Sequence, residues 1–124
     1  MPFDAGTRAL IDGAYEVRIE TTRPDSTARR TIIWIMVEGE DVFVRSVRGD
    51  RGHWFHSAMD TDEPLTLIVG KQRIPVRAEL AADPDSIARC TRALEQKYAN
   101  DPALSSMLRP HTLATTLRLE PAPA

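Results

Sequence analysis

The sequence contains little cysteine and little lysine. Cys90 is its only cysteine, which excludes an intrachain disulfide and any metal site built from several thiolates. Lysine occurs twice, at Lys71 and Lys97, among sixteen basic residues. This preference for arginine, together with frequent alanine, aspartate and proline, is typical of bacteria with GC-rich genomes. The formal net charge of -2 excludes a general nucleic-acid binder, because such a protein presents a basic surplus.

Long hydrophobic runs are also absent. No apolar stretch approaches the roughly 20 residues that a membrane-spanning helix needs. The first residues, Met1 to Asp4, do not begin a basic segment followed by an apolar one, as a secretory signal does. We therefore expect a soluble cytoplasmic protein that does not enter a membrane. With 124 residues, the chain has the length of a single domain, 1-124, with a modest core.

Most of the hydrophobic pattern is typical of β-structure. Six strands are expected, over residues 17–21, 31–37, 42–47, 65–69, 73–80 and 112–120. The segment 31–37 is apolar on both faces, which predicts a central strand that is covered on both sides. The turn Gly39–Asp41 predicts a hairpin. Pro75 indicates that its strand lies at a sheet edge or carries a bulge, because proline cannot donate a ladder hydrogen bond.

Helical patterns are short and lie before, between and after the strands. Helices are expected over 1–14, over 53–59 and, as an excursion of two helices, over 83–108. Asp83 suits a helix N-cap and Pro84 the first helical position, whereas Pro110 ends the excursion. The pattern predicts a mainly β protein of the α+β class, an antiparallel barrel of six strands with short helices at its ends.

The segment from Arg45 to Phe55 is the most informative part of the sequence. It follows a predicted strand and contains three arginines, two glycines and a serine before the aromatic pair Trp54-Phe55. Arginine offers a fixed fork of N–H donors, and glycine lets the backbone approach a ligand closely. These residues predict a loop that binds a phosphate group. The alternative interpretation is a solvated turn in which Asp50 pairs with neighbouring arginines.

Several short motifs resemble the flavin-binding split barrels, the superfamily of pyridoxamine-phosphate-oxidase-like proteins and deazaflavin-dependent reductases. The motifs are Arg29–Trp34, Val42–Gly49, Trp54-Phe55 and Ile74–Ala78. The resemblance extends from about Glu16 to Glu120 and is greatest to an uncharacterised bacterial family within the superfamily. It implies a split β-barrel and a homodimer, with FMN or the deazaflavin coenzyme in a groove that both subunits line.

The resemblance and the arginine-containing loop together give a set of candidate cofactor-binding residues. These are Arg45, Ser46, Arg48, Gly49, Arg51, Trp54, Thr31 and Trp34. Ser46, Arg48, Gly49 and Arg51 match the phosphate-holding positions of the superfamily, and Trp34 with Met36 would pack near the ring. For Trp34 and Met36 themselves, ordinary core packing is the preferred interpretation. The superfamily commonly has a proline where this chain has His53.

The expected activity is the reduction of a small organic substrate such as an enone, a quinone or a nitroaromatic compound. A flavin-type cofactor supplies the hydride chemistry itself, so the lack of a catalytic triad does not argue against an enzyme. The alternative is a barrel without a redox cofactor, acting as a cyclase, an isomerase or a small-molecule-binding protein in specialised metabolism. His53 in place of the proline is consistent with that alternative.

The histidines and the cysteine give weaker indications. His56 is the one candidate catalytic residue, as a general acid toward the substrate. His53 and His56 lie three residues apart, a spacing that suits metal ligands, and imidazole can also bind haem. We predict no metal site, because no cysteine or carboxylate completes a ligand set. His111 is expected to be a surface or structural residue, and Cys90 a small core residue.

Overall fold

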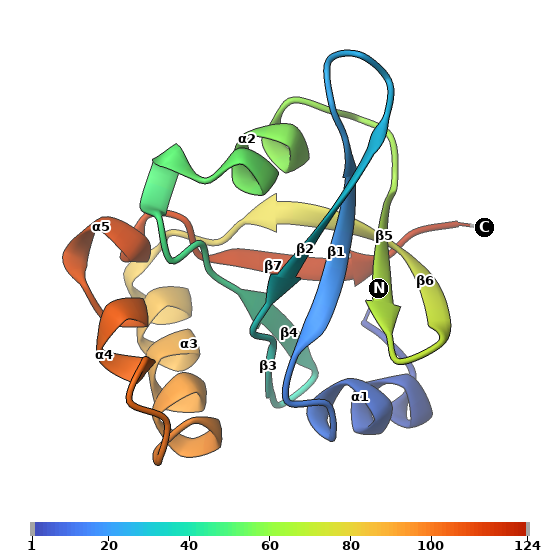
Figure 1. The fold of residues 1–124 in the computed structure, drawn as a ribbon. Coiled ribbons are helices and arrows are strands. Elements are labelled where there is room, and N and C mark those ends of the chain that lie inside the picture. Colours follow the sequence, from blue (N-terminus) through green and yellow to red (C-terminus); the bar gives the residue numbers. More distant parts are fainter. Residues whose placement is uncertain (1, 124) are drawn as a thin grey trace.

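A computed structural model describes residues 2–123, and its centre is a strongly curled antiparallel sheet (Figure 1). The seven strands follow the order β2-β1-β5-β6-β7-β4-β3, and all neighbouring pairs are antiparallel. They are β1 (Val17–Thr22), β2 (Ala28–Ile33), β3 (Met36–Glu38), β4 (Asp41–Val44), β5 (Leu65–Val69), β6 (Gln72–Leu80) and β7 (Leu117–Pro121). The fold is a split half-barrel of mixed α and β structure, with seven strands rather than the six predicted.

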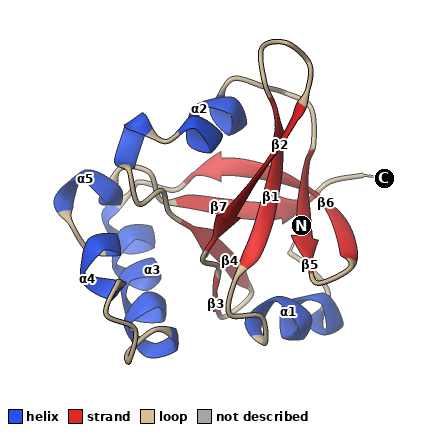
Figure 2. Ribbon diagram, in the orientation of Figure 1, coloured by secondary structure: helices blue, strands red, loops and turns tan. Residues whose placement is uncertain are grey.

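The helices lie around the sheet (Figure 2). They are α1 (Ala5–Asp12), the 3-10 turn η1 (Gly49–Arg51), α2 (His53–Met59), α3 (Pro84–Lys97), α4 (Leu104–Met107) and α5 (Pro110–Leu113). Helices α3, α4 and α5 form one group beside the sheet, whereas α1 and α2 lie near its two ends (Figure 1). No helix within residues 2–123 combines the length and the apolar character that crossing a membrane requires.

The prediction of one central strand over 31–37 is wrong. The segment is divided between β2, which ends at Ile33, and β3, which begins at Met36. These two strands are the outermost strands of the sheet, so the chain passes from one edge directly to the other through Trp34 and Ile35. This division accounts for the seventh strand.

Tyr98, at the end of α3, supports the crossing between the two edges. Its hydroxyl accepts a hydrogen bond from the Ile35 N–H at 3.2 Å and donates one to the Tyr15 carbonyl at 2.7 Å. The Ile35 carbonyl accepts a hydrogen bond from Lys97 Nζ at 2.9 Å. Side chains of α3 thus satisfy the backbone groups that leave the ladder, and the apolar pattern of 31–37 contains no sign of this.

Two other predictions differ from the structure. Pro75 lies in β6, which is an interior strand and not a sheet edge. However, the pairing of β6 with β7 begins only at Val76, so Pro75 lies just outside that ladder. The Pro75 carbonyl still accepts a hydrogen bond from the Ala122 N–H at 3.0 Å, so little of the ladder is lost. The last strand begins at Leu117, because Pro110 begins α5 instead of ending a helix.

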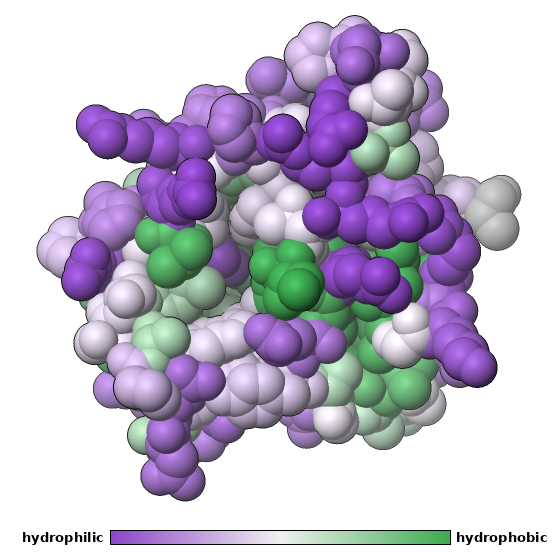
Figure 3. Space-filling model, in the orientation of Figure 1, coloured by the Kyte–Doolittle hydropathy of each residue, from purple (hydrophilic) through white to green (hydrophobic). Residues whose placement is uncertain are grey.

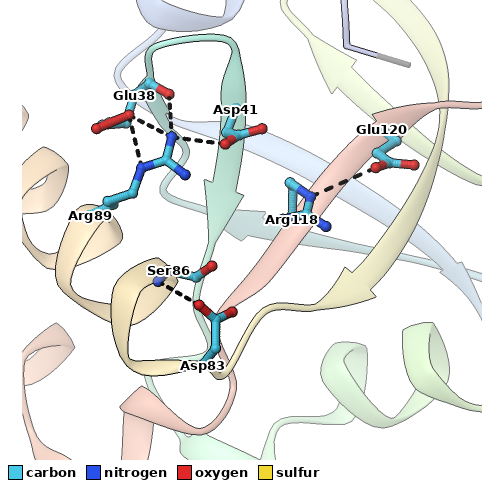
Figure 4. A network of polar contacts seen from close by, with 7 residues as sticks. All are labelled: Glu38, Asp41, Asp83, Ser86, Arg89, Arg118 and Glu120. Carbon is cyan, nitrogen blue, oxygen red and sulfur yellow. Dashed lines mark hydrogen bonds and ion pairs between the residues drawn. The ribbon is translucent and has the colours of Figure 1, made fainter.

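The hairpins and the main helix agree with the predictions. Gly39 and Gly70 adopt φ values of 61° and 60° in the turns that join β3 to β4 and β5 to β6. A positive φ favours glycine, which explains the residue at both positions. Asp83 caps α3, since its carboxylate accepts a hydrogen bond from the Ser86 N–H at 3.0 Å (Figure 4).

Two hydrophobic clusters stabilise the fold. The larger cluster fills the inside of the curled sheet and is covered by apolar residues of α1 and α2, such as Ile11 and Phe55. The smaller cluster lies between α3 and the β3–β4 hairpin and contains Met36, Phe43 and Cys90. The second cluster holds α3 against one edge of the sheet, beside the crossing described above.

Candidate functional site

A cavity of about 610 Å³, here called the first cavity, opens beside the crossing from β2 to β3. Its wall also includes residues of the loop after β4 and of the α3–α4 connection. A volume of this size lies within the usual range for small-molecule sites, roughly 300–1,000 Å³. Six of the eight predicted cofactor-binding residues line it, namely Thr31, Trp34, Arg45, Ser46, Arg48 and Trp54. The structure therefore brings together residues that are distant in the sequence.

Ser46 and Gly52 form a small polar recess in this cavity. Ser46 is 1% exposed, and its N–H donates a hydrogen bond to the Thr115 hydroxyl at 3.1 Å. The Ser46 hydroxyl itself makes no hydrogen bond with any of residues 2–123, although Ser46 borders the cavity. A Cβ at Gly52 would collide with Ser46 Oγ, so glycine at this position makes room for the Ser46 hydroxyl itself. A hydroxyl without a protein partner at the wall of a cavity suits an oxygen atom of a phosphate or a carboxylate.

Arg48 and Arg29 supply positive charge without an internal partner. Both side chains line the first cavity, and neither takes part in a hydrogen bond or an ion pair within the described part of the chain. Arg30, also at the cavity, is instead paired with Glu20, with 2.9 Å between Nε and Oε1. Arg48 and Arg29 therefore remain available to an anionic ligand.

Arg45 is different, because its guanidinium is buried within the protein. It donates hydrogen bonds to Thr116 Oγ1 at 3.0 Å and to the Met107 carbonyl at 3.3 Å. The second terminal nitrogen, Nη2, donates to the Ile87 carbonyl and to Thr91 Oγ1, each at 3.2 Å. All three guanidinium nitrogens of Arg45 are therefore engaged. Burial lowers the pKa of Arg45, but arginine stays protonated in proteins. No partner is a carboxylate, so the charge favours an anion in the neighbouring cavity.

Aromatic rings form another wall of the first cavity. Trp34 stacks on Tyr98 with 3.9 Å between ring centroids and 4° between the ring planes. Tyr15 meets Trp34 edge-on at 6.3 Å, and its hydroxyl donates a hydrogen bond to Asp101. This hydrogen bond holds the pKa of Asp101 below its ordinary value. Trp34 is thereby fixed in orientation as a flat apolar surface.

Gly49, Arg51 and Met36 do not line this cavity. Gly49 has a φ of 63°, and a Cβ there would lie 2.7 Å from the His111 carbonyl oxygen, so it shapes the loop. Arg51 is exposed and lies beside a separate hollow with Asp50. The ion pairs among residues 2–123 do not include Asp50, contrary to the solvated-turn interpretation. Met36 is fully buried against α3, which confirms core packing, the preferred interpretation of this residue.

The histidines lie in three different surroundings. His53 lines the first cavity and also a second one, whereas His56 lines only the second. His111 is exposed, with Nε2 3.1 Å from the Val47 carbonyl oxygen. Within residues 2–123, no group of three or more histidines, cysteines or acidic residues is placed to hold a metal ion. Burial raises the pKa of Cys90 to about 11, as befits a core thiol.

Sequence reasoning did not identify Tyr15, Tyr98 or Asp101 as part of the site. Asp101 precedes Pro102, a pattern typical of a helix start, and Tyr98 follows Ile87, Cys90 and Leu94 at helical spacing, so each residue has a sufficient structural explanation. One sequence signal could have drawn attention to Tyr98. Its side chain carries a polar hydroxyl, whereas the other residues of this apolar series carry none except Cys90, which has a thiol. No sequence signal indicated that Tyr15 would meet residues more than eighty positions away.

The family comparison gives one match that covers nearly the whole chain. Residues 8–119 match the profile described as "Uncharacterized protein conserved in bacteria (DUF2255)". No curated protein matched the sequence.

Solved structures with the same fold are distant in sequence. ChuZ from Campylobacter jejuni has a TM-score of 0.68 and 5% identity over 93% of this chain, which spans only 50% of ChuZ. HutZ, the heme storage protein from Vibrio cholerae, has a TM-score of 0.61 and 12% identity, covering 100% of this chain and 93% of HutZ. An F420 reductase has a TM-score of 0.57 and 16% identity, covering 98% of this chain and 97% of that one. Pyridoxamine-phosphate-oxidase-like structures also match. These likenesses confirm the predicted split-barrel fold.

Proposed function

Because the chain belongs to the bacterial DUF2255 family and has the fold of the flavin-binding split barrels, we propose that it is an oxidoreductase with a flavin-type cofactor in the first cavity. The cofactor is FMN or the deazaflavin coenzyme, and the substrate is a small organic molecule. The observation that carries the proposal is the unpartnered Ser46 hydroxyl beside Gly52, in the same cavity as the free Arg48 and the flat surface of Trp34.

The residues of the cavity fit such a cofactor in charge and in shape. Ser46 and Arg48 bind the phosphate of the tail, and Gly52 leaves room for the Ser46 hydroxyl. Trp34, fixed by Tyr98, packs against the ring. Arg45 adds a positive charge that favours an anionic ligand without offering it many free N–H groups. When bound, the cofactor supplies the hydride chemistry.

We also infer a homodimer, because the first cavity extends around the free edge of β2. Thr31, on the half-buried inner face of this strand, and Ile32, on its outer face, both line the cavity. Ile32 is 63% exposed, and Figure 3 shows an apolar area over this part of the molecule with polar residues around it. A second copy placed against β2 would cover Ile32 and close the cavity. The substrate would then meet a site that two chains form.

Ligand titrations followed by tryptophan fluorescence test the cofactor proposal. Trp34 and Trp54, the two tryptophans of the sequence, both line the first cavity. We expect FMN or the deazaflavin coenzyme to quench them saturably. Arg48→Ala should weaken binding at least tenfold, because a charge-assisted hydrogen bond contributes about 1.5–3 kcal/mol. Arg51→Ala is the matched control, since Arg51 belongs to the same loop but lies outside the cavity, and its affinity should be unchanged.

Other outcomes would replace the proposal. If neither compound binds to the folded protein, the barrel is a binding protein or a non-redox enzyme without a flavin-type cofactor. If haemin alone binds, and His53→Ala removes its Soret shift, the cavity is a haem site, which would parallel the heme storage protein HutZ. Equal losses in Arg48→Ala and Arg51→Ala would show that the phosphate does not lie at Ser46.

A further inference from the structure

A second cavity of about 640 Å³ lies between α2 and the hairpin that joins β1 to β2. In Figure 1 this hairpin projects beyond the rest of the sheet, with α2 beside it. The second cavity shares Arg23, Arg29 and His53 with the first cavity. The two cavities are therefore neighbours that are separated by a wall of basic side chains.

Charge is unevenly distributed around the second cavity. The residues that it shares with the first cavity are basic, whereas Asp60 and Glu63 line the second cavity only. Glu20 also lines it, but this carboxylate is neutralised by Arg30 at 2.9 Å and Arg73 at 2.7 Å. The end next to the first cavity is consequently positive, and the other part of the wall is negative.

The opposite charges of this cavity do not neutralise one another. Within residues 2–123, no ion pair involves Arg29, Asp60 or Glu63. The folded backbone fixes them on different elements, with Arg29 in β2, Asp60 at the end of α2, and Glu63 before β5. A ligand with complementary charges at its two ends can contact both sides, because each side retains its own unpaired charge.

We propose that the second cavity binds a small zwitterion that carries a carboxylate at one end and an amine at the other. The carboxylate lies toward Arg29, and the amine lies toward Asp60 and Glu63. The hydroxyls of Ser57 and Thr61 line the same cavity and suit a polar chain between the two ends. The two cavities share Arg29, but Asp60 and Glu63, which would bind the amine, border only the second cavity.

A series of ω-amino acids tests the site in the full-length chain. Glycine, 4-aminobutanoate, 6-aminohexanoate and 8-aminooctanoate are titrated while the histidine ring signals are followed by NMR. We expect saturable shifts at His56 and a maximum of affinity at one chain length, about tenfold tighter than butanoate or butylamine, because only the zwitterion contacts both ends. His111, which lines neither of these two cavities, serves as the internal reference and should not shift.

Variants distinguish this site from nonspecific attraction. The double variant Asp60→Asn, Glu63→Gln should bind the preferred zwitterion no more tightly than the carboxylate of the same chain length that lacks the amine. Arg29→Gln should bind it no more tightly than the amine of the same chain length that lacks the carboxylate. Glu95→Gln, on the exposed part of α3, is the control and should change nothing. Equal affinity for all chain lengths, no saturable shift at His56, or parallel shifts at His111 would overturn the proposal.

The double variant keeps the two proposals distinguishable, because Asp60 and Glu63 do not border the first cavity. FMN and deazaflavin titrations of the Asp60→Asn, Glu63→Gln protein should match those of the wild type. Failure of cofactor binding in the wild type leaves the zwitterion result standing, whereas loss of zwitterion selectivity leaves the cofactor result standing.

Discussion

Among single residues, Thr21 is the clearest imperfection of the fold. It is 2% exposed, and its Oγ1 is buried without a hydrogen-bond partner within residues 2–123. Other buried threonines differ, as the Thr112 hydroxyl donates to the Met107 carbonyl at 2.8 Å. A buried hydroxyl that loses its hydrogen bonds to water and gains none in the protein lowers stability.

Thr21→Val should therefore stabilise the protein. Valine has the shape of threonine and removes the unpartnered oxygen, so we expect the free energy of unfolding to rise by about 1 kcal/mol. Urea denaturation followed by fluorescence measures it. Thr112→Val, the matched control, should lower the free energy of unfolding by a similar amount. A loss of stability in Thr21→Val would show that its hydroxyl has a partner in solution.

The arginines of the loop show what sequence can and cannot predict at the level of residues. Their composition predicted a loop that binds a phosphate group, and Arg48 of this loop lines the first cavity. It could not indicate that Arg45 points inward, because the acceptors come from residues 42 to 71 positions away. It also could not separate Arg48 from Arg51, since their separation depends on the φ of 63° at Gly49.

Among the elements, α3 and the β3–β4 hairpin are joined by one arginine. Arg89 pairs with Glu38 at 2.7 Å and with Asp41 at 2.8 Å, as Figure 4 shows. The same guanidinium lies 5.5 Å from the centre of the Phe43 ring. The Arg118–Glu120 pair in Figure 4 connects two residues of β7 and so holds no elements together. Arg89 thus links a helix to the outer edge of the sheet.

This link predicts a pH dependence of stability. Arg89 holds the pKa of the Glu38 carboxyl below its ordinary value of 4.5. The contribution of Glu38 to stability is therefore complete above that value and is lost as the pH falls below it. We expect Glu38→Gln to be less stable than the wild type at pH 7 and the difference to shrink toward pH 3, as measured by urea denaturation. Glu40→Gln, in the same hairpin, should show no such trend, and a constant difference for Glu38→Gln would contradict the link.

Local patterns predicted the elements better than their pairing. The turn at Gly39 and the start of α3 at Asp83 follow from chemistry within a few residues, and the structure confirms both. The split of the segment 31–37 depends on Tyr98, which is more than sixty residues away. The apolar residues of the segment 31–37 do not indicate such a distant partner, so their pattern predicts one continuous strand.

At the level of the whole molecule, the proposed dimer can be tested directly. Ile32→Glu places a charge on the exposed outer face of β2, and we expect it to convert a dimer into a monomer, as measured by sedimentation velocity. Leu80→Glu is the control, because Leu80 is also exposed, at 56%, but lies at the end of β6. A wild-type monomer, or dissociation caused equally by both variants, would contradict the assignment of β2 to the interface.

The direct passage from β2 to β3 also limits how far the barrel can open. Three peptide steps separate Ile33 from Met36, and a fully extended chain covers about 11 Å over that length. Covalent bonds therefore set the greatest distance between the edge strands β2 and β3 at this crossing. A hydrogen-bonded strand pair, in contrast, could separate further. Trp34, within this crossing, lines the first cavity and stacks on Tyr98. A ligand that needs a wider cavity therefore cannot gain the space by separation of the two sheet edges at the crossing.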